Sequence, residues 1–422
     1  MSTPHASAIW HPFTQHALQP VMTKIARAEG AWLEAADGSR IFDGISSWWV
    51  VTHGHNYPPI VRAIQRQAGV LDQVIFAGFT HEPAEEVARR LIEIAPAGLA
   101  HVFFSDSGST SVEVALKMAL GYFRHQGEPR SRIVALEHAY HGDTIGTMSA
   151  GARGVFNAPY EPLLFDVERL PFPEQGREQR THDAFEAICK REPPAALILE
   201  PLILGAGGML VYGPDVLAGL KRICEAHGVL FIADEVMTGF GRTGTLFACE
   251  QADISPDIMC LSKGLTGGVI PLAVTLCRHG IFEAHWSADR SRMFFHSSSF
   301  TANPIACAAA AANLEVWARE PVRERIAALA SAQAARLERF RADGRFSNVR
   351  QAGTIAALDL NAVDAGYLAG VATKLYNFFA ERGLLLRPLG NTIYVMPPYC
   401  TAPDELDAAY AAIAEAADLA RK

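Results

Sequence analysis

The sequence lacks an uninterrupted apolar run of the roughly 20 residues that a membrane-spanning helix needs. Even the alanine-rich stretch after Cys307 is interrupted at Asn313 and Glu315. The first residues, MSTPHASAIWHPF, lack the basic segment followed by an apolar run that marks a signal peptide. We therefore expect a cytoplasmic protein with no membrane partner.

The cysteine pattern and the net charge each argue against one class of binding site. The seven cysteines are scattered, with no CxxC pair and no metal-ligand spacing, so we expect reduced thiols and no metal site. The formal net charge of −8 at pH 7 argues against a general attraction to nucleic acid. A local basic pocket for a single phosphate group is still compatible with this charge.

What the sequence has is an alternation of short apolar runs with amphipathic helical stretches. The runs HVFFS, RIVALE, AALILE, VLFIADE, DIMCLS and LAVTLC are typical of buried strands. The first is followed by SVEVALKMALGYFR, a predicted helix in which Glu113 and Lys117 are spaced for an i,i+4 pair. Apolar strands separated by helices predict an α/β fold with a mostly parallel sheet covered on both faces.

The pattern changes after about residue 315. Helical segments predicted near 319–343, 365–382 and 403–421 flank the strand-like runs GTIAALDL and NTIYVMPP. This pattern predicts a smaller α+β domain. We expect an N-terminal segment at 1–50 that joins this smaller domain, a large domain at 51–315, and the small domain itself at 316–422.

An acid and a lysine follow two of the apolar runs. Asp234 ends VLFIAD, and Lys263 leaves DIMCLS for a glycine-rich turn. Neighbouring parallel strands would place both at one sheet edge, where ligands of such folds bind. A desolvated lysine can attack a carbonyl group, and a pyridine-ring cofactor needs an acid beside its ring nitrogen. The spacing alone is equally compatible with a buried ion pair.

Two upstream motifs also suggest binding. SDSGSTSVE places Gly108 and Ser109 at a strand-to-helix junction, which suits a phosphate cradle or a plain helix cap. EHAYHGDT offers Tyr140 to stack on a flat ring, with Asp143 nearby.

Two other patterns resemble a metal site and a dinucleotide-binding site, but we expect neither site. His138 and His141 have no third ligand spaced to join them in a metal site. GFGRTG matches a dinucleotide-binding pattern by its letters, but residues 234–238 separate it from its strand, so we predict a loop.

Taken in order, SDSGSTSVEVALKMA, AYHGDT, ADEVMTGFGRTG, CLSKGLTGG and FFHSSSFTANPIACAAA resemble the class III aminotransferases of fold type I. The similarity runs over essentially the whole chain. It implies an enzyme that uses pyridoxal 5′-phosphate, with a mostly parallel seven-stranded sheet in the large domain and a smaller α+β domain. It also favours Schiff-base chemistry at Lys263 over the ion pair.

The resemblance implies a role for each matching residue. Lys263 would hold the cofactor as a Schiff base and later move the proton. Asp234 would pair with the pyridine nitrogen, and Tyr140 would stack on the ring. Gly108 and Ser109 would bind the phosphate.

The resemblance also implies a homodimer with shared active sites. In this family a threonine of the neighbouring subunit completes the phosphate site, from a segment that matches HSSSF. Ser299 occupies the threonine position and keeps a hydroxyl group, with Ser298 beside it.

Within the family, IWHPFT, DGISSWW, HGDTIGTMSA and LLLRPLGNTIYVMPPY resemble the branch that acts in biotin biosynthesis. That branch implies transfer of an amino group from S-adenosylmethionine to 8-amino-7-oxononanoate, giving 7,8-diaminononanoate. Arg387 would bind the acceptor carboxylate, because a guanidinium pairs with a carboxylate in two hydrogen bonds. The substrate-binding residues that the resemblance implies are Phe13, Trp48, Tyr140, Asp143, Gly268 and Arg387.

Phe13 departs from the pattern of that branch, which usually has a tyrosine here whose hydroxyl lies in the active site. Phenylalanine keeps the aromatic wall and loses one hydrogen bond. The donor is therefore open between S-adenosylmethionine, lysine and a simpler ω-amine. An ω-amino acid or amine:pyruvate aminotransferase of the same class is the alternative. Without the resemblance, Trp48 would be interpreted as a core aromatic and Arg387 as part of a surface ion pair.

Overall fold

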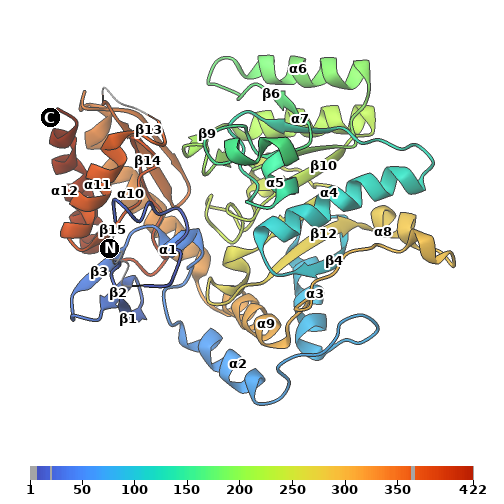
Figure 1. Ribbon diagram of the computed structural model, residues 1–422, viewed down its shortest axis with the longest axis horizontal. Coiled ribbons are helices and arrows are strands. Elements are labelled where there is room, and N and C mark those ends of the chain that lie inside the picture. The colour runs from blue at the N-terminus through green and yellow to red at the C-terminus, as the bar shows by residue number, and fades with distance from the viewer. Residues whose placement is uncertain (1–6, 20, 363–365, 422) are drawn as a thin grey trace, which may run out of the picture.

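The computed structural model describes residues 7–19, 21–362 and 366–421. Figure 1 shows a larger lobe, built from the middle of the chain, beside a smaller lobe that contains both termini. A seven-stranded sheet in the order β4-β12-β11-β10-β7-β5-β6 forms the centre of the larger lobe. Its strands are β4 (Leu99–Ser105), β5 (Ile133–Leu136), β6 (Glu168–Leu170), β7 (Ala196–Leu199), β10 (Leu230–Asp234), β11 (Ile258–Leu261) and β12 (Ala273–Arg278).

The sheet confirms the predicted α/β fold. Strand β12 is antiparallel to both of its neighbours, and the other neighbouring pairs are parallel. All six apolar runs form strands of this sheet, and β6 is a strand that the sequence did not predict. Strands β10 and β11 are neighbours, so Asp234 and Lys263 do reach the same edge of the sheet.

Helices cover both faces of the sheet because alternate strand residues point to opposite sides. Val134 and Phe231 pack with α3, α6, α7 and α9 on one face, while Ile133 and Ile232 pack with α4 and α8 on the other. This explains why the strands are apolar at nearly every position. The helices of the larger lobe are α2 (Pro58–Ala68), α3 (Glu82–Ile94), α4 (Gly108–His125), α5 (Ile145–Ala150), α6 (Glu178–Arg191), α7 (Pro214–His227), α8 (His279–His285) and α9 (Pro304–Arg319).

One local prediction for α4 is wrong. Glu113 and Lys117 do not pair with each other. The Glu113 carboxylate accepts hydrogen bonds from the Thr144 hydroxyl and the Gly146 N–H, at 2.6 and 2.8 Å. Lys117 instead donates to the carbonyl of Phe295. A tertiary contact therefore takes the place of the expected local pair. This contact anchors to α4 the loop that contains Tyr140 and Thr144.

The smaller lobe contains a three-stranded and a four-stranded sheet. In the four-stranded sheet β3 pairs in parallel with β15, so the N-terminal segment is joined to the C-terminal part. The three helices predicted after residue 315 are present with shorter ends. The elements are β1 (Ile25–Glu29), β2 (Trp32–Ala35), β3 (Arg40–Asp43), β13 (Phe346–Ala352), β14 (Ile355–Leu360), β15 (Leu384–Leu385), β16 (Thr392–Val395), α10 (Val322–Arg341), α11 (Gly370–Glu381) and α12 (Pro403–Ala416).

Two composition-based expectations can be compared with the structure. All seven cysteines are free, as expected, and six are buried, but Cys400 is exposed. Among the helices in the part of the chain that the structure describes, none has the length and apolarity to span a bilayer.

The GFGRTG motif forms a loop, as predicted, and it connects the two lobes. The side chain of Arg242 is buried and donates to the carbonyls of Val51 and Pro397. Its own carbonyl accepts from the N–H of Thr354, at the turn between β13 and β14. Gly353 in that turn has φ +55°, and a Cβ there would lie 2.2 Å from the carbonyl carbon of Thr243.

Gly353→Ala is therefore expected to destabilise the protein by about 2–5 kcal/mol, through left-handed strain and overpacking against backbone. Thermal or denaturant unfolding would measure the effect. Gly344→Ala is the matched control, because Gly344 lacks a positive φ and an added Cβ meets no atom within 4 Å. Equal stability of the two variants would show that the lobes do not depend on this close approach.

Candidate active site

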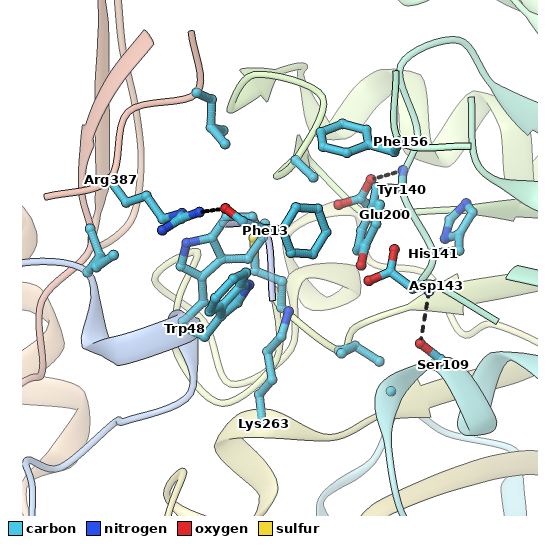
Figure 2. Close-up of a pocket in the computed structure, with 18 of the residues that line it drawn as sticks. Phe13, Trp48, Ser109, Tyr140, His141, Asp143, Phe156, Glu200, Lys263 and Arg387 are labelled. Atoms are coloured by element: carbon cyan, nitrogen blue, oxygen red, sulfur yellow. Dashed lines mark hydrogen bonds between the residues drawn. The ribbon is translucent and has the colours of Figure 1, made fainter. Parts of the chain in front are cut away.

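A cavity of about 380 Å³ lies between the lobes, at the carboxyl ends of β7, β10 and β11 (Figure 2). Both lobes and the N-terminal segment contribute to its walls. Nine of the residues that the family resemblance assigns to the site line it: Phe13, Trp48, Gly108, Ser109, Tyr140, Asp143, Asp234, Lys263 and Arg387.

Lys263 begins a short 3₁₀ helix just after β11, with φ +46°, and its side chain extends into the cavity. Burial disfavours the cation and lowers the pKa of Lys263 to about 8, although the charges of Asp234 and Glu200 oppose this shift. Its Nζ lies 5.0 Å from the centre of the Trp49 ring. No Asp234–Lys263 ion pair forms among the described residues, so the ion pair that the spacing also allowed is wrong. The amine is therefore neutral at mildly alkaline pH.

Asp234 is held by a histidine. Its Oδ2 lies 2.7 Å from Nδ1 of the buried His141 ring, and its Oδ1 accepts from the Val236 N–H at 3.1 Å. Nε2 of His141 is buried and has no hydrogen-bond partner in the described residues. His141 is thus a positioning residue for this carboxylate. The sequence had suggested His141 only as a metal candidate.

Glu200 is a buried acid that sequence reasoning missed. It follows β7 and accepts hydrogen bonds from the N–H groups of Tyr140 and Gly205, at 3.0 and 2.9 Å. Burial raises the pKa of Glu200 to about 7, and the charge of Asp234 adds to the rise while His141 opposes it. An acid at the end of the run AALILE is the same signal that identified Asp234, so the sequence did contain it.

Gly108 and Ser109 form the first turn of α4. Ser107 caps this helix by accepting from the Thr110 N–H, which leaves the N–H groups of Gly108 and Ser109 outside the helical ladder. A Cβ on Gly108 would lie 2.6 Å from a methyl group of Val236, so only glycine allows this close approach. Backbone N–H groups at a helix start, together with the helix dipole, favour an anion such as phosphate.

An aromatic wall encloses the remaining cavity. Phe13 packs against Trp48 and Phe156, with ring centroids 5.7 and 6.0 Å apart, and Phe156 packs against Tyr367 at 4.4 Å. Burial raises the pKa of the Tyr140 hydroxyl, and the carboxylate of Asp143 adds to the rise. Phe156 and Tyr367 lie in loops and carried no sequence signal.

Arg387 enters the cavity from the smaller lobe. Its Nη2 donates to the Phe13 carbonyl at 2.7 Å, and its guanidinium carbon lies 5.3 Å from the Trp48 ring centroid. It forms no surface ion pair among the described residues. Trp48 is half-exposed and faces the cavity, whereas its neighbour Trp49 is buried and donates to the Tyr394 hydroxyl.

Three predicted site residues do not line this cavity in the single chain. Gly268 lies against the Val50 backbone, where an added Cβ would be 2.3 Å from the carbonyl oxygen. Ser298 donates to Asp106, and the Ser299 carbonyl accepts from Gln73. Their roles in substrate and phosphate binding stay predictions. His138 and His141 do not form a three-ligand metal group in the part of the chain that is described.

Comparison with known proteins gives consistent matches along the chain. The family model for class-III aminotransferases matches residues 13–417. An adenosylmethionine-8-amino-7-oxononanoate aminotransferase of Synechococcus elongatus is 48% identical over 425 residues, 99% of each chain. A protein of the same name from Geobacter sulfurreducens is 38% identical and covers 94% of this chain and 93% of its own.

Two solved structures have the same fold. An adenosylmethionine-8-amino-7-oxononanoate aminotransferase from Methanocaldococcus jannaschii superposes with TM-score 0.93 at 32% identity, covering 98% of this chain and 97% of its own. An amine transaminase from an uncultivated Pseudomonas species, in its PLP-bound form, gives TM-score 0.92 at 33% identity, covering 99% and 100%.

The lowered pKa of Lys263 predicts how the rate at which an aldehyde attaches to the cofactor-free protein depends on pH. Attachment of pyridoxal 5′-phosphate to Lys263 should accelerate about tenfold per pH unit up to about pH 8 and then level off, because only the neutral amine reacts. Borohydride trapping and mass spectrometry of the Lys263 peptide would measure the rate, with Lys263→Ala as the blank.

Asp234→Asn should move the inflection to lower pH, because it removes a negative charge that favours the lysine cation. The rate should be measured from about pH 6.5 to about pH 9.5, roughly 1.5 units on either side of the lysine pKa. A rate that stays constant over this range, or an inflection that moves to higher pH in Asp234→Asn, would contradict this electrostatic account.

Proposed function

The chain belongs to the class III aminotransferases, and from that premise we propose that it transfers an amino group from S-adenosylmethionine to 8-amino-7-oxononanoate in biotin biosynthesis. The product would be 7,8-diaminononanoate. The observation that carries this proposal is the 48% identity, over nearly the full length of both chains, to an enzyme with that name. Enzymes of this class depend on pyridoxal 5′-phosphate.

The residues of the cavity fit that cofactor. Its aldehyde carbon needs a neutral amine, and burial lowers the pKa of Lys263 to about 8. Its ring nitrogen needs a fixed carboxylate, which Asp234 supplies with the support of His141. Its phosphate needs free N–H groups, and the α4 start offers those of Gly108 and Ser109. Tyr140 lies beside this space and would contact the ring.

In the proposed mechanism Lys263 moves protons. When bound, the cofactor supplies an electron-withdrawing ring that stabilises the charge left as a proton leaves the substrate carbon. Nζ of Lys263 would accept the proton from the donor's α-carbon and would return a proton to the acceptor's carbon. Proton transfer by a positioned group is typically worth roughly 10²–10⁴-fold in rate. The wall of Phe13, Trp48 and Phe156 would exclude water during the transfer.

Arg387 would bind the acceptor carboxylate. The Phe13 carbonyl and the Trp48 ring hold its guanidinium at the edge of the cavity. A planar guanidinium held in this way can form two parallel hydrogen bonds to a carboxylate. Phe13 thus contributes through its backbone carbonyl even though its side chain lacks a hydroxyl.

The proposal includes a homodimer with shared active sites in the cytoplasm. Ser298 and Ser299 are outside their own chain's cavity, so a phosphate-binding role requires them to reach the site of a second copy. Phe295 and Phe300 on either side of them are more than 60% exposed in the single chain. Large exposed apolar side chains at this segment are typical of a contact surface.

The alternative function is an ω-amino acid or amine:pyruvate aminotransferase of the same class. One observation favours it. The amine transaminase structure matches this chain about as well as the Methanocaldococcus jannaschii structure does, with TM-scores of 0.92 and 0.93. The two functions differ in donor, which is therefore the quantity to test.

A half-reaction panel on the cofactor-loaded protein tests the donor. S-adenosylmethionine, lysine, alanine and a simple ω-amine are mixed in singly while the absorbance of the Lys263-bound cofactor is followed. We expect S-adenosylmethionine to remove that band and 8-amino-7-oxononanoate to restore it. Lys263→Ala should show neither the band nor turnover. Reaction only with alanine or ω-amines, followed by restoration with pyruvate, would favour the alternative function.

Arg387→Ala should raise the KM for 8-amino-7-oxononanoate roughly 10- to 100-fold, because the variant loses the binding free energy of hydrogen bonds to a charged group. The donor half-reaction should change less. Steady-state kinetics would separate the two effects. Arg382→Ala is the matched control, because Arg382 lies nearby in sequence but pairs with Glu415 at the surface. An unchanged KM for the acceptor in Arg387→Ala would show that Arg387 does not bind its carboxylate.

A further inference from the structure

Asn313 is a buried amide within an otherwise apolar part of a helix. It interrupts the run IACAAAAANL in α9, and its side chain is 0% exposed. Asparagine forms helices less readily than alanine, so this residue does not serve the helix itself. A buried amide also costs free energy unless its polar groups have partners. The contribution of Asn313 therefore lies in the contacts of its side chain.

The NH₂ group of Asn313 holds the turn that begins at Lys263. Its Nδ2 donates to the carbonyls of Gly264 and Leu265, at 2.9 and 3.0 Å. These two residues follow Lys263 in the short 3₁₀ helix Lys263–Thr266. Helix α9 is thereby tied to the segment from which the lysine side chain enters the cavity.

His53 fixes the amide from the other side. Its Nε2 lies 2.7 Å from Oδ1 of Asn313, and the histidine is 3% exposed. Two carbonyls can be paired only with the NH₂ group, so Oδ1 faces His53, and Nε2 of His53 carries the hydrogen. Burial lowers the pKa of His53 to about 4, so the ring is neutral at neutral pH. Its Nδ1 is buried without a hydrogen-bond partner among the described residues, which fits the nitrogen that carries no hydrogen.

The turn needs this support because of its backbone conformation. Lys263 has φ +46°, in the left-handed region that is unfavourable for any residue but glycine. Such a conformation persists only where the surrounding structure holds it. On another side of the turn, a Cβ added at Gly264 would lie 2.8 Å from Cβ of Phe240 in the GFGRTG loop. The turn is thus held between α9 and that loop.

We propose that Asn313, supported by His53, is a positioning residue that holds the strained turn so that the Lys263 side chain keeps one direction into the cavity. Neither Asn313 nor His53 is among the residues that line the cavity, so both act through the backbone after Lys263. The inference rests on the part of the proposed function that assigns Lys263 to the cofactor. It does not depend on which donor reacts.

Attachment of pyridoxal 5′-phosphate to the cofactor-free protein tests this role. The quantity to measure is the first-order rate at saturating cofactor, on the high-pH plateau of each variant, where the lysine is neutral and its pKa no longer matters. Asn313→Ala should lower this rate about 10- to 100-fold, because a displacement of about 1 Å can cost about 10²-fold. In the loaded protein, the circular dichroism of the bound-cofactor band should also fall, because that signal depends on a fixed orientation of the cofactor.

Gln333→Ala is the matched control. Gln333 is another fully buried amide, in α10, and it donates to the Thr354 carbonyl and accepts from the Tyr410 hydroxyl. Its loss should lower the melting temperature much as Asn313→Ala does. The plateau rate should nevertheless stay within about twofold of wild type, because these contacts do not hold the Lys263 turn.

Two further variants separate hydrogen bonding from packing. Asn313→Asp keeps the shape of the side chain, but a carboxylate cannot donate to two carbonyls, so its rate should fall as far as that of Asn313→Ala. His53→Phe keeps a ring beside Tyr57 and Trp317 and removes the donor to Asn313. It should lower the rate by a smaller factor, about three- to tenfold, as expected for one hydrogen bond. If Asn313→Ala does not fold, His53→Phe supplies the test.

The outcomes separate this inference from the proposed function. A wild-type plateau rate in Asn313→Asp and His53→Phe would show that the His53–Asn313 pair does not position Lys263, while trapping on Lys263 would still support the assignment of the lysine. An equal fall in Gln333→Ala would trace the loss to general destabilisation and would also overturn the inference. If borohydride traps no cofactor on Lys263 of the wild type, the assignment of the lysine fails, and the positioning role fails with it.

Discussion

A charged group loses its hydration when it is buried, and the candidate site depends on how three side chains respond to that constraint. Burial lowers the pKa of Lys263 to about 8 and raises that of Glu200 to about 7. Asp234 keeps a fixed orientation through His141 and the Val236 N–H. The result is a reactive amine near an oriented carboxylate at one edge of a sheet, which is the arrangement that Schiff-base chemistry with a pyridine-ring cofactor needs.

The cavity around this arrangement requires both lobes. The larger lobe supplies the lysine, the acids and the helix start, and the smaller lobe supplies Arg387 and Tyr367. The GFGRTG loop connects them through the buried Arg242 and through the close approach of Gly353 to the Thr243 backbone. A motif that resembles a nucleotide-binding pattern by its letters thus serves here to position the walls of a cavity.

The walls of the cavity are largely aromatic, and in the proposed function they would contact the substrates. Phe13 accepts a hydrogen bond from Arg387 through its carbonyl and offers the cavity only a ring, so the hydroxyl groups of the lining come from other residues, among them Tyr140, Tyr367 and Tyr394. Asp143 lines both the main cavity and a smaller cavity that shares part of its wall.

The sequence by itself determined six of the seven strands of the large sheet, the apolar character of both sheet faces and the shared edge of Asp234 and Lys263, because strand periodicity and burial are local properties of the chain. It also carried the family resemblance that the comparisons confirm. Tertiary structure alone decided that Glu113 binds the Thr144 loop rather than Lys117, and that His141 orients Asp234. It also brought Phe156 and Tyr367 together between the lobes. These contacts join residues far apart in the sequence, and their partners depend on how the helices and lobes pack, which no local pattern encodes.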